Sequence, residues 1–164
     1  TNRSISYQGP KLHSAVFKGD ITTTRRLLAE SGQDINLRDR DGCTALHIAA
    51  EEFPRITEIL MQHKANAELK DADGYSPIHY AALSGNIKTL SKLLEYGADL
   101  KSLTAKDHWS AFHIAAGSPT LSREDRIATT LFLMAKGLMP VAAKRYLLVF
   151  RNDPGLDARF VPGK

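Results

Sequence analysis

The chain has 164 residues, of which 43% are hydrophobic and 24% are charged, and its formal net charge is +4. This length is enough for one hydrophobic core, so we expect a single domain. The sequence has no run of eighteen apolar residues, which argues against membrane insertion. Its single cysteine, Cys43, excludes an intrachain disulfide framework and is typical of a reducing compartment.

Positive charge is concentrated near the end of the chain. Residues 1–135 hold 16 Lys and Arg against 16 Asp and Glu, whereas residues 136–164 hold 6 against 2. A nucleic-acid-binding surface needs basic residues gathered on one face. The neutral body therefore argues against a nucleic-acid partner. The basic end is interpreted as a solvated tail or, alternatively, as a contact for an acidic partner.

Residues 1–9 are interpreted as an N-terminal extension. They contain neither a starting Met nor the apolar stretch of a signal peptide. We therefore expect the chain to be part of a longer intracellular protein, in the cytoplasm or the nucleus.

The motif [S/T]-x-[L/I/F]-H-x-A-A occurs at residues 44–50, 76–82 and 110–116, with a degenerate copy at 10–15. Successive motif histidines are 34, 32 and 34 residues apart. After the three clear copies, apolar residues recur at helical spacing within 56–60, 87–94 and 127–134. A fixed period of this length indicates small helical units that bury their apolar faces by stacking.

The units differ in their turns and loops. Lys64 stands where the other second helices are followed by Gly, and the turn before Trp109 is expected to be one residue longer than its counterparts. His108 replaces the turn Gly, and since a positive φ costs a non-Gly residue energy, we expect another form of turn there. Residues 117–125 form an expanded loop, which we interpret as a tolerated surface insertion or, alternatively, as part of a binding face.

The unit resembles the ankyrin repeat, a β-turn and two antiparallel helices in about 33 residues. The resemblance implies an all-α solenoid within residues 10–137, with repeat 1 at about 10–40, repeat 2 at 41–72, repeat 3 at 73–106 and repeat 4 at 107–137. It also implies a monomeric module that binds a partner protein through its concave face and hairpin tips. We expect a scaffold, targeting or regulatory domain of a larger protein, or a microbial effector. The alternative is a regulatory domain of an enzyme or channel whose active part lies outside this chain.

No catalytic motif is found in the sequence: it lacks a phosphate-binding loop, H-E-x-x-H and a nucleophile elbow. Cys43 lies near His47, but that His recurs in every unit, and the resemblance implies that it bonds the Thr or Ser three residues before it. Stacked helices lie about 8–10 Å apart, which separates the motif histidines too widely for one metal ion. We therefore expect no enzymatic activity, no cofactor and no metal.

The variable positions of the ankyrin unit map onto the hairpins and first helices of this chain. Tyr75 and Trp109 occupy equivalent positions, and we expect them to project next to each other as aromatic anchors. Alternatively, Trp109 folds back over the stack. The predicted partner-binding residues are Arg38, Arg40, Asp41, Lys70, Asp73, Tyr75, Leu83, Lys106, Asp107 and Trp109.

Two further segments carry predictions. Asn36 stands where ankyrin repeats often carry an Asn that an asparaginyl hydroxylase modifies, although such an Asn commonly serves the hairpin backbone. Residues 138–164 lie outside the resemblance. We interpret them as a basic capping segment or tail, whose apolar stretch 141–150 covers repeat 4, because terminal repeats need a polar outer face. Alternatively, it continues into further repeats or a neighbouring domain.

Overall fold

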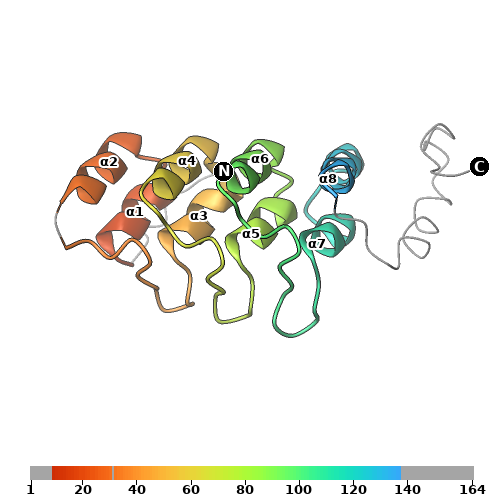
Figure 1. Cartoon of the computed structure of the whole chain (residues 1–164), viewed down its shortest axis with the longest axis horizontal. Helices are drawn as coiled ribbons and strands as arrows, with labels where there is room; N and C mark the ends of the chain where they lie inside the picture. The colour runs from red at the N-terminus through yellow and green to blue at the C-terminus, as the bar shows by residue number, and fades with distance from the viewer. Residues whose placement is uncertain (1–8, 31, 138–164) are drawn as a thin grey trace, which may run out of the picture.

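The computed structural model describes residues 9–30 and 32–137, and within these residues eight helices form four pairs in a row (Figure 1). The first helix of each pair, here called the inner helix, is α1 (Lys11–Phe17), α3 (Ala45–Glu52), α5 (Pro77–Leu83) or α7 (Ala111–Gly117). The second, outer helix is α2 (Ile21–Ala29), α4 (Pro54–Gln62), α6 (Ile87–Glu95) or α8 (Arg123–Ala135). No strand occurs in the described residues, and the expected all-α solenoid is confirmed.

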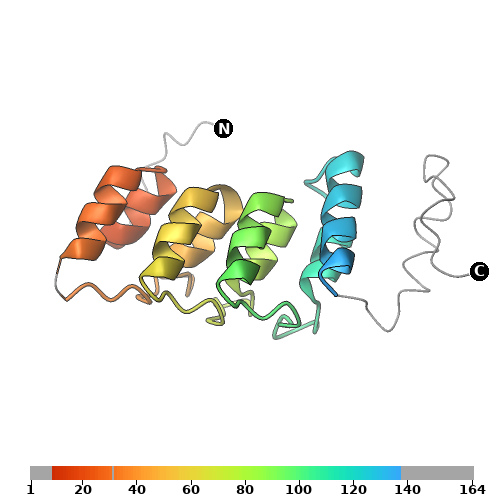
Figure 2. The ribbon, with the colours of Figure 1, turned by 45° about the horizontal axis from the view of Figure 1, so that its top comes forward.

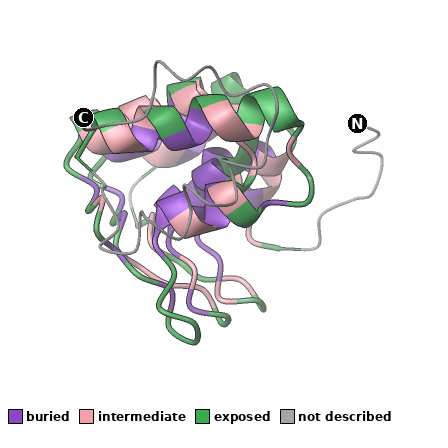
Figure 3. Cartoon of the chain, turned by 90° about the vertical axis from the view of Figure 1, so that its right-hand side faces the viewer, coloured by how far each residue is buried: buried purple, intermediate pink, exposed green. Residues whose placement is uncertain are grey.

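The helices form two layers, and the loops between repeats project from one side as a row of hairpins (Figures 1 and 2). Inner helices pack against neighbouring inner helices, and α4 packs against α2 and α6 in the outer layer. α8 packs mainly against α7 and contacts α6 much less than α4 does. Viewed along the stack, the helical layers and the hairpins make an L, whose inside is bordered by inner helices and hairpins (Figure 3).

The motif serine or threonine starts each of the last three inner helices. In α3 the Thr44 side chain accepts a hydrogen bond from the backbone N–H of His47, and His47 Nδ1 accepts one from the Thr44 N–H at 3.0 Å. α5 and α7 begin with the same reciprocal capping box. Because the box satisfies donors that a helix start leaves unpaired, the motif fixes where each helix begins.

Three turns are irregular. In repeat 2, Phe53 both ends α3 and caps α4, and Pro54 begins α4 with a φ that suits a first helical residue, so these helices have no loop between them. Lys64 has a φ of 65°, as the Gly that it replaces would have. His108 also has a positive φ, 53°, despite the energetic cost to a non-Gly residue. Its hairpin nevertheless differs in length from the hairpins before α3 and α5.

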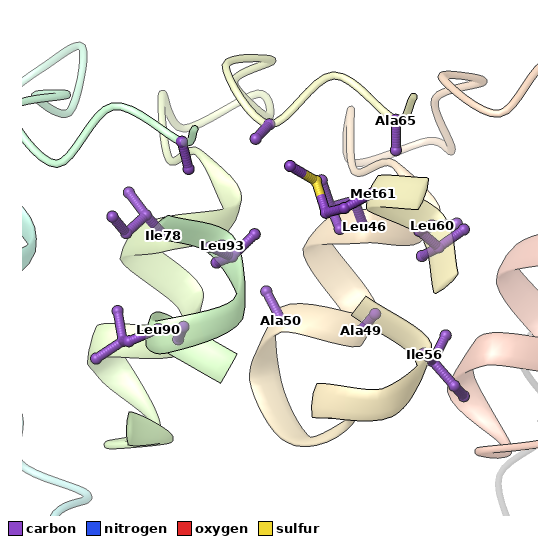
Figure 4. Close-up of a cluster of buried hydrophobic side chains, with 14 of the residues drawn as sticks. Leu46, Ala49, Ala50, Ile56, Leu60, Met61, Ala65, Ile78, Leu90 and Leu93 are labelled. Carbon is purple, nitrogen blue, oxygen red and sulfur yellow. The ribbon is translucent and has the colours of Figure 1, made fainter. Parts of the chain in front are cut away.

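A continuous apolar core runs between the two layers and from repeat to repeat. Figure 4 shows its centre, where alanines at the ends of the inner helices let the outer-helix leucines approach closely. Leu60, Leu90 and Leu93 are fully buried there. No single pair of helices encloses these side chains, so each repeat depends on its neighbours for burial.

Candidate partner-binding surface

The candidate surface is built on the three hairpins that precede α3, α5 and α7. In the first, Asp39 Oδ1 accepts hydrogen bonds from the backbone N–H groups of Asp41 at 3.0 Å and Cys43 at 2.9 Å. Asp71 Oδ1 does the same in the second hairpin. These hydrogen bonds brace both turns, and the side chains exposed at their tips are Arg40, Asp41, Ala72 and Asp73.

Neighbouring hairpins are joined through their backbones. The Ala72 N–H donates to the Asp41 carbonyl at 2.9 Å, and the Ala105 N–H donates to the Gly74 carbonyl at 3.2 Å. The hairpin row is consequently a continuous surface whose tips hold fixed positions relative to one another.

The third hairpin departs from this pattern. Thr104 replaces the organising aspartate: its N–H donates to the Trp109 carbonyl, and its Oγ1 accepts from the Trp109 N–H at 3.0 Å. The equivalent backbone bonds join Asp39 to Cys43 and Asp71 to Tyr75, so this hairpin is one residue longer, as predicted. His108, with its positive φ, directly precedes Trp109 in this longer hairpin.

The residue before each motif serine or threonine becomes more exposed along the stack. Cys43 is only 9% exposed, Tyr75 is half-buried and Trp109 is 46% exposed. The Tyr75 ring meets the rings of His79 and Tyr80 edge-on, with centroids 6.0 and 6.4 Å apart. Of the two predicted anchors, Tyr75 thus packs within its own repeat, whereas most of the free aromatic surface belongs to Trp109.

Three of the predicted basic residues connect successive loops between repeats. Arg38 Nη1 donates to the Lys70 carbonyl and Lys70 Nζ donates to the Leu103 carbonyl, both at 2.7 Å. Lys106 Nζ forms an exposed ion pair with Asp73 Oδ1 at 2.9 Å. Such exposed pairs stabilise little, but these contacts hold the loops in register. Asp107, which follows Lys106 in the chain, is also exposed.

The end of α5 is covered by the expanded loop of repeat 4. Leu83 is 38% exposed, and its carbonyl accepts hydrogen bonds from Ser118 Oγ at 3.1 Å and Thr120 Oγ1 at 3.4 Å. Leu121 lies against Gly85, where an added Cβ would come within 2.7 Å of the leucine side chain. The loop therefore folds back onto repeat 3.

The motif histidines connect each repeat to the next. His13, His47 and His79 are fully buried, and each brings its Nε2 within about 3.0 Å of a carbonyl in the loop that leads to the next inner helix. Burial lowers the pKa of His47, and it lowers that of His79 to about 4, so both rings are neutral at pH 7. The carbonyls belong, in order, to Cys43, Tyr75 and Ser102.

A polar network around Tyr80 was not predicted. The Tyr80 hydroxyl donates to Asp71 Oδ2 at 2.7 Å and lies 3.3 Å from Cys43 Sγ of the preceding repeat. Burial raises the pKa of the Cys43 thiol to about 11, so the thiol is protonated at neutral pH and is not poised as a nucleophile. One feature of the sequence could have indicated this network: Tyr80 brings a hydroxyl to the motif position that is occupied by Ile48 in repeat 2 and Ile114 in repeat 4.

Asn36 serves the hairpin backbone. Its Oδ1 accepts a hydrogen bond from the Asn66 N–H of the next repeat at 2.9 Å. One repeat later, Glu68 Oε1 accepts from the Asp99 N–H in the same way. The predicted hydroxylation of Asn36 stays a prediction, which mass spectrometry of the native protein would check.

The described helices and clusters limit the possible sites. None of these helices has the length and apolar character that crossing a bilayer requires. The described residues also hold no group of three or more His, Cys, Asp or Glu arranged for a metal ion.

Comparison with known proteins identifies the repeat. A family model of three ankyrin repeats matches residues 12–104 and, in an overlapping match, residues 54–138. The chain is 41% identical over 73 residues to human BCL-6 corepressor-like protein 1. This match covers 44% of this chain and 4% of that protein. It is 33% identical over 117 residues to the chicken nuclear factor NF-kappa-B p105 subunit, and this match covers 69% of this chain and 12% of that protein. An ankyrin repeat protein of fowlpox virus, FPV024, is 27% identical over 107 residues, covering 63% and 18%.

The chain thus spans less than a fifth of the length of these relatives. Ankyrin repeats generally act as protein-interaction modules and are generally not catalytic. With the family match extending over most of its length and four stacked helix pairs in its fold, the chain belongs to the ankyrin-repeat family.

Proposed function

We propose that this stack is a non-catalytic module that binds a partner protein on the side bordered by hairpins and inner helices, with Trp109 as its main anchor. The observation that carries the proposal is the exposure of the Trp109 side chain, 46% against 9% for Cys43 at the equivalent position. Protein interfaces draw much of their binding energy from a few such aromatic residues.

The residues around the anchor have two different roles in this proposal. Arg40, Asp41 and Asp107 are exposed on the hairpins and are placed to contact the partner directly. Their mixed charges favour specificity and encounter rate over affinity. Arg38 and Lys70 bind backbone carbonyls of the next repeat, so they position the surface.

The module is proposed to act within a larger intracellular protein, as a scaffold, targeting or regulatory domain. The much greater length of the relatives supports a multidomain setting. The partner is a protein and not a nucleic acid, a proposal supported by the balanced charge of residues 1–135.

The test is a pull-down from lysate with quantitative mass spectrometry, in which wild type is compared with Trp109→Ala. Tyr96→Ala is the matched control, because Tyr96 is 39% exposed but lies at the end of an outer helix. A protein enriched by wild type and by Tyr96→Ala should be lost with Trp109→Ala. With that protein purified, the variant should bind about thirtyfold more weakly, which corresponds to about 2 kcal/mol. Equal capture by all three baits, each with a wild-type circular dichroism spectrum, would refute Trp109 as the anchor.

A further inference from the structure

The last repeat has an open side among the described residues. In the first three repeats the motif histidine and the residue three positions after it are both fully buried, because the next repeat covers them. In repeat 4 the equivalent residues, His113 and Ala116, are partly exposed. Figure 3 looks onto this end of the stack.

The outer helix of repeat 4 is apolar where earlier outer helices are polar. In α4, Glu58 reaches Lys92 of the next repeat at 3.4 Å and Gln62 donates to the Tyr96 hydroxyl at 3.1 Å. Counting back from the turn residues Lys64 and Gly137, the equivalents of Glu58 and Gln62 in α8 are Leu131 and Ala135. Leu131 is 37% exposed.

Other residues enlarge this apolar surface. Met61 is 7% exposed in α4, but its equivalent Met134 is only partly buried. Ile127, one turn before Leu131, is also partly exposed. We call Ala116, Ile127, Leu131, Met134 and Ala135 the open face of repeat 4.

The opposite end of the stack differs. Ser14 occupies the motif position that holds Tyr80 in repeat 3, and Tyr80 is the side chain that reaches back to the preceding repeat. A pocket at this end is lined largely by polar residues, including Lys11, Ser14, Lys18, Thr23 and Arg26. Repeat 1 thus already has the polar outer face that a terminal repeat needs, whereas repeat 4 does not.

We propose that residues 141–150 of the same chain cover the open face of repeat 4. This stretch, Val-Ala-Ala-Lys-Arg-Tyr-Leu-Leu-Val-Phe, begins four residues after Gly137, which follows the C-cap of α8, so it is close enough to reach the face. It supplies five large apolar side chains within its last five residues.

Charge and sequence also favour this occupant. Lys144 and Arg145 are suited to Glu124 and Asp125, which are exposed at the start of α8. Residues 138–164 do not contain the repeat motif, so they would close the stack and not lengthen it. The stretch lies outside the described residues, and the inference is independent of the partner proposed above.

Disulfide trapping in the full chain tests the proposal. In a Cys43→Ser background, Leu131→Cys is combined in turn with Leu147→Cys, Leu148→Cys and Phe150→Cys, and oxidised glutathione serves as oxidant. Leu37→Cys replaces Leu131→Cys in the control series, since Leu37 is 44% exposed but lies in the loop between α2 and α3, far along the chain from repeat 4. Ala135→Cys provides a second position on the open face.

The expected result is an intrachain disulfide for at least one pair on the open face, formed at least tenfold faster than any pair with Leu37→Cys. Peptide mass spectrometry identifies the bridge, and light scattering gives the mass of the oxidised species. The proposal is overturned if the open face and the control react at equal rates. It is also overturned if the open-face cysteines form bridges only between two chains, which would make a second copy the occupant.

Discussion

At the scale of single residues, each interior motif histidine uses both ring nitrogens. Nδ1 of His47 accepts a hydrogen bond from the Thr44 N–H, so Nε2 carries the hydrogen and donates to the Tyr75 carbonyl. His79 is bound in the same way between Ser76 and Ser102. A protonated ring would lose the bond to its own helix start, and its charge would be buried.

The stability of the fold should therefore decrease in mild acid. The pKa of His79 is about 4 in the folded protein against an ordinary value of 6.5, because burial disfavours the charged ring. The unfolded chain then binds the proton first as pH falls. The stabilisation is complete above pH 6.5, and roughly 3 kcal/mol of it is lost as pH falls to 4. Urea unfolding at a series of pH values measures this loss.

His79→Gln should show a shallower decrease of unfolding free energy between pH 6.5 and 4 than wild type. His63→Gln controls for the substitution itself, since His63 is exposed at the end of α4. Identical slopes for His79→Gln and wild type would show that another group titrates in this range.

At the scale of elements, the row of hairpins depends on close backbone approach. Gly74 has a φ of 89°, and a Cβ there would lie 2.3 Å from the Ala105 side chain and 2.6 Å from its backbone nitrogen. Gly97 has nearly the same φ, 88°, but a Cβ there would meet nothing within 4 Å. Substitutions at Gly74 and Gly97 can therefore be compared to separate the cost of backbone strain from the cost of disturbed packing between hairpins.

Gly97→Ala should lower the free energy of unfolding by about 1 kcal/mol, through strain at positive φ alone. Gly74→Ala should lower it by about 3 kcal/mol, because the second and third hairpins must also move apart. Urea denaturation of both variants checks the difference. Equal losses of unfolding free energy in the two variants would mean that the second and third hairpins move apart at Gly74 without further destabilisation.

Local sequence features predicted the elements well. Helical spacing and the recurring motif indicated the helix pairs, and the count of residues between motifs indicated the longer turn before Trp109. Helix starts and turns are set by residues within a few positions of each other, which a single sequence displays.

The surface was predicted less completely, because its geometry depends on residues far apart in the chain. Arg38 binds a carbonyl 32 residues away, and Lys70 one 33 residues away, so their side chains are turned toward the next repeat. Tyr75 was expected to project like Trp109, but packing against His79 and Tyr80 keeps it half-buried. No spacing rule within one repeat indicates contacts of this kind.

At the scale of the whole molecule, stability comes from contacts between neighbouring repeats. Repeats 2 and 3 have a described neighbour on each side, whereas repeat 1 has one, and α2 contacts α4 less than α4 contacts α6. We expect backbone amides in α1 and α2 to exchange with solvent at least tenfold faster than those in α3 and α5. Hydrogen exchange read by mass spectrometry measures this, and uniform protection of all four repeats would show that the stack opens only as one unit.

The forward-reaching histidines also bear on how such a chain changes by gene duplication. The junctions between repeats 1 and 2 and between repeats 2 and 3 are joined alike, since His13 and His47 each bind the carbonyl of the residue before the next motif. A copy of repeat 2 inserted at either junction would find the same partners on both sides. His79 instead binds the carbonyl of Ser102, seven residues before Trp109. The loop between α6 and α7 thus lacks the contact that joins the earlier repeats, and insertions or deletions of whole units should be tolerated best ahead of it.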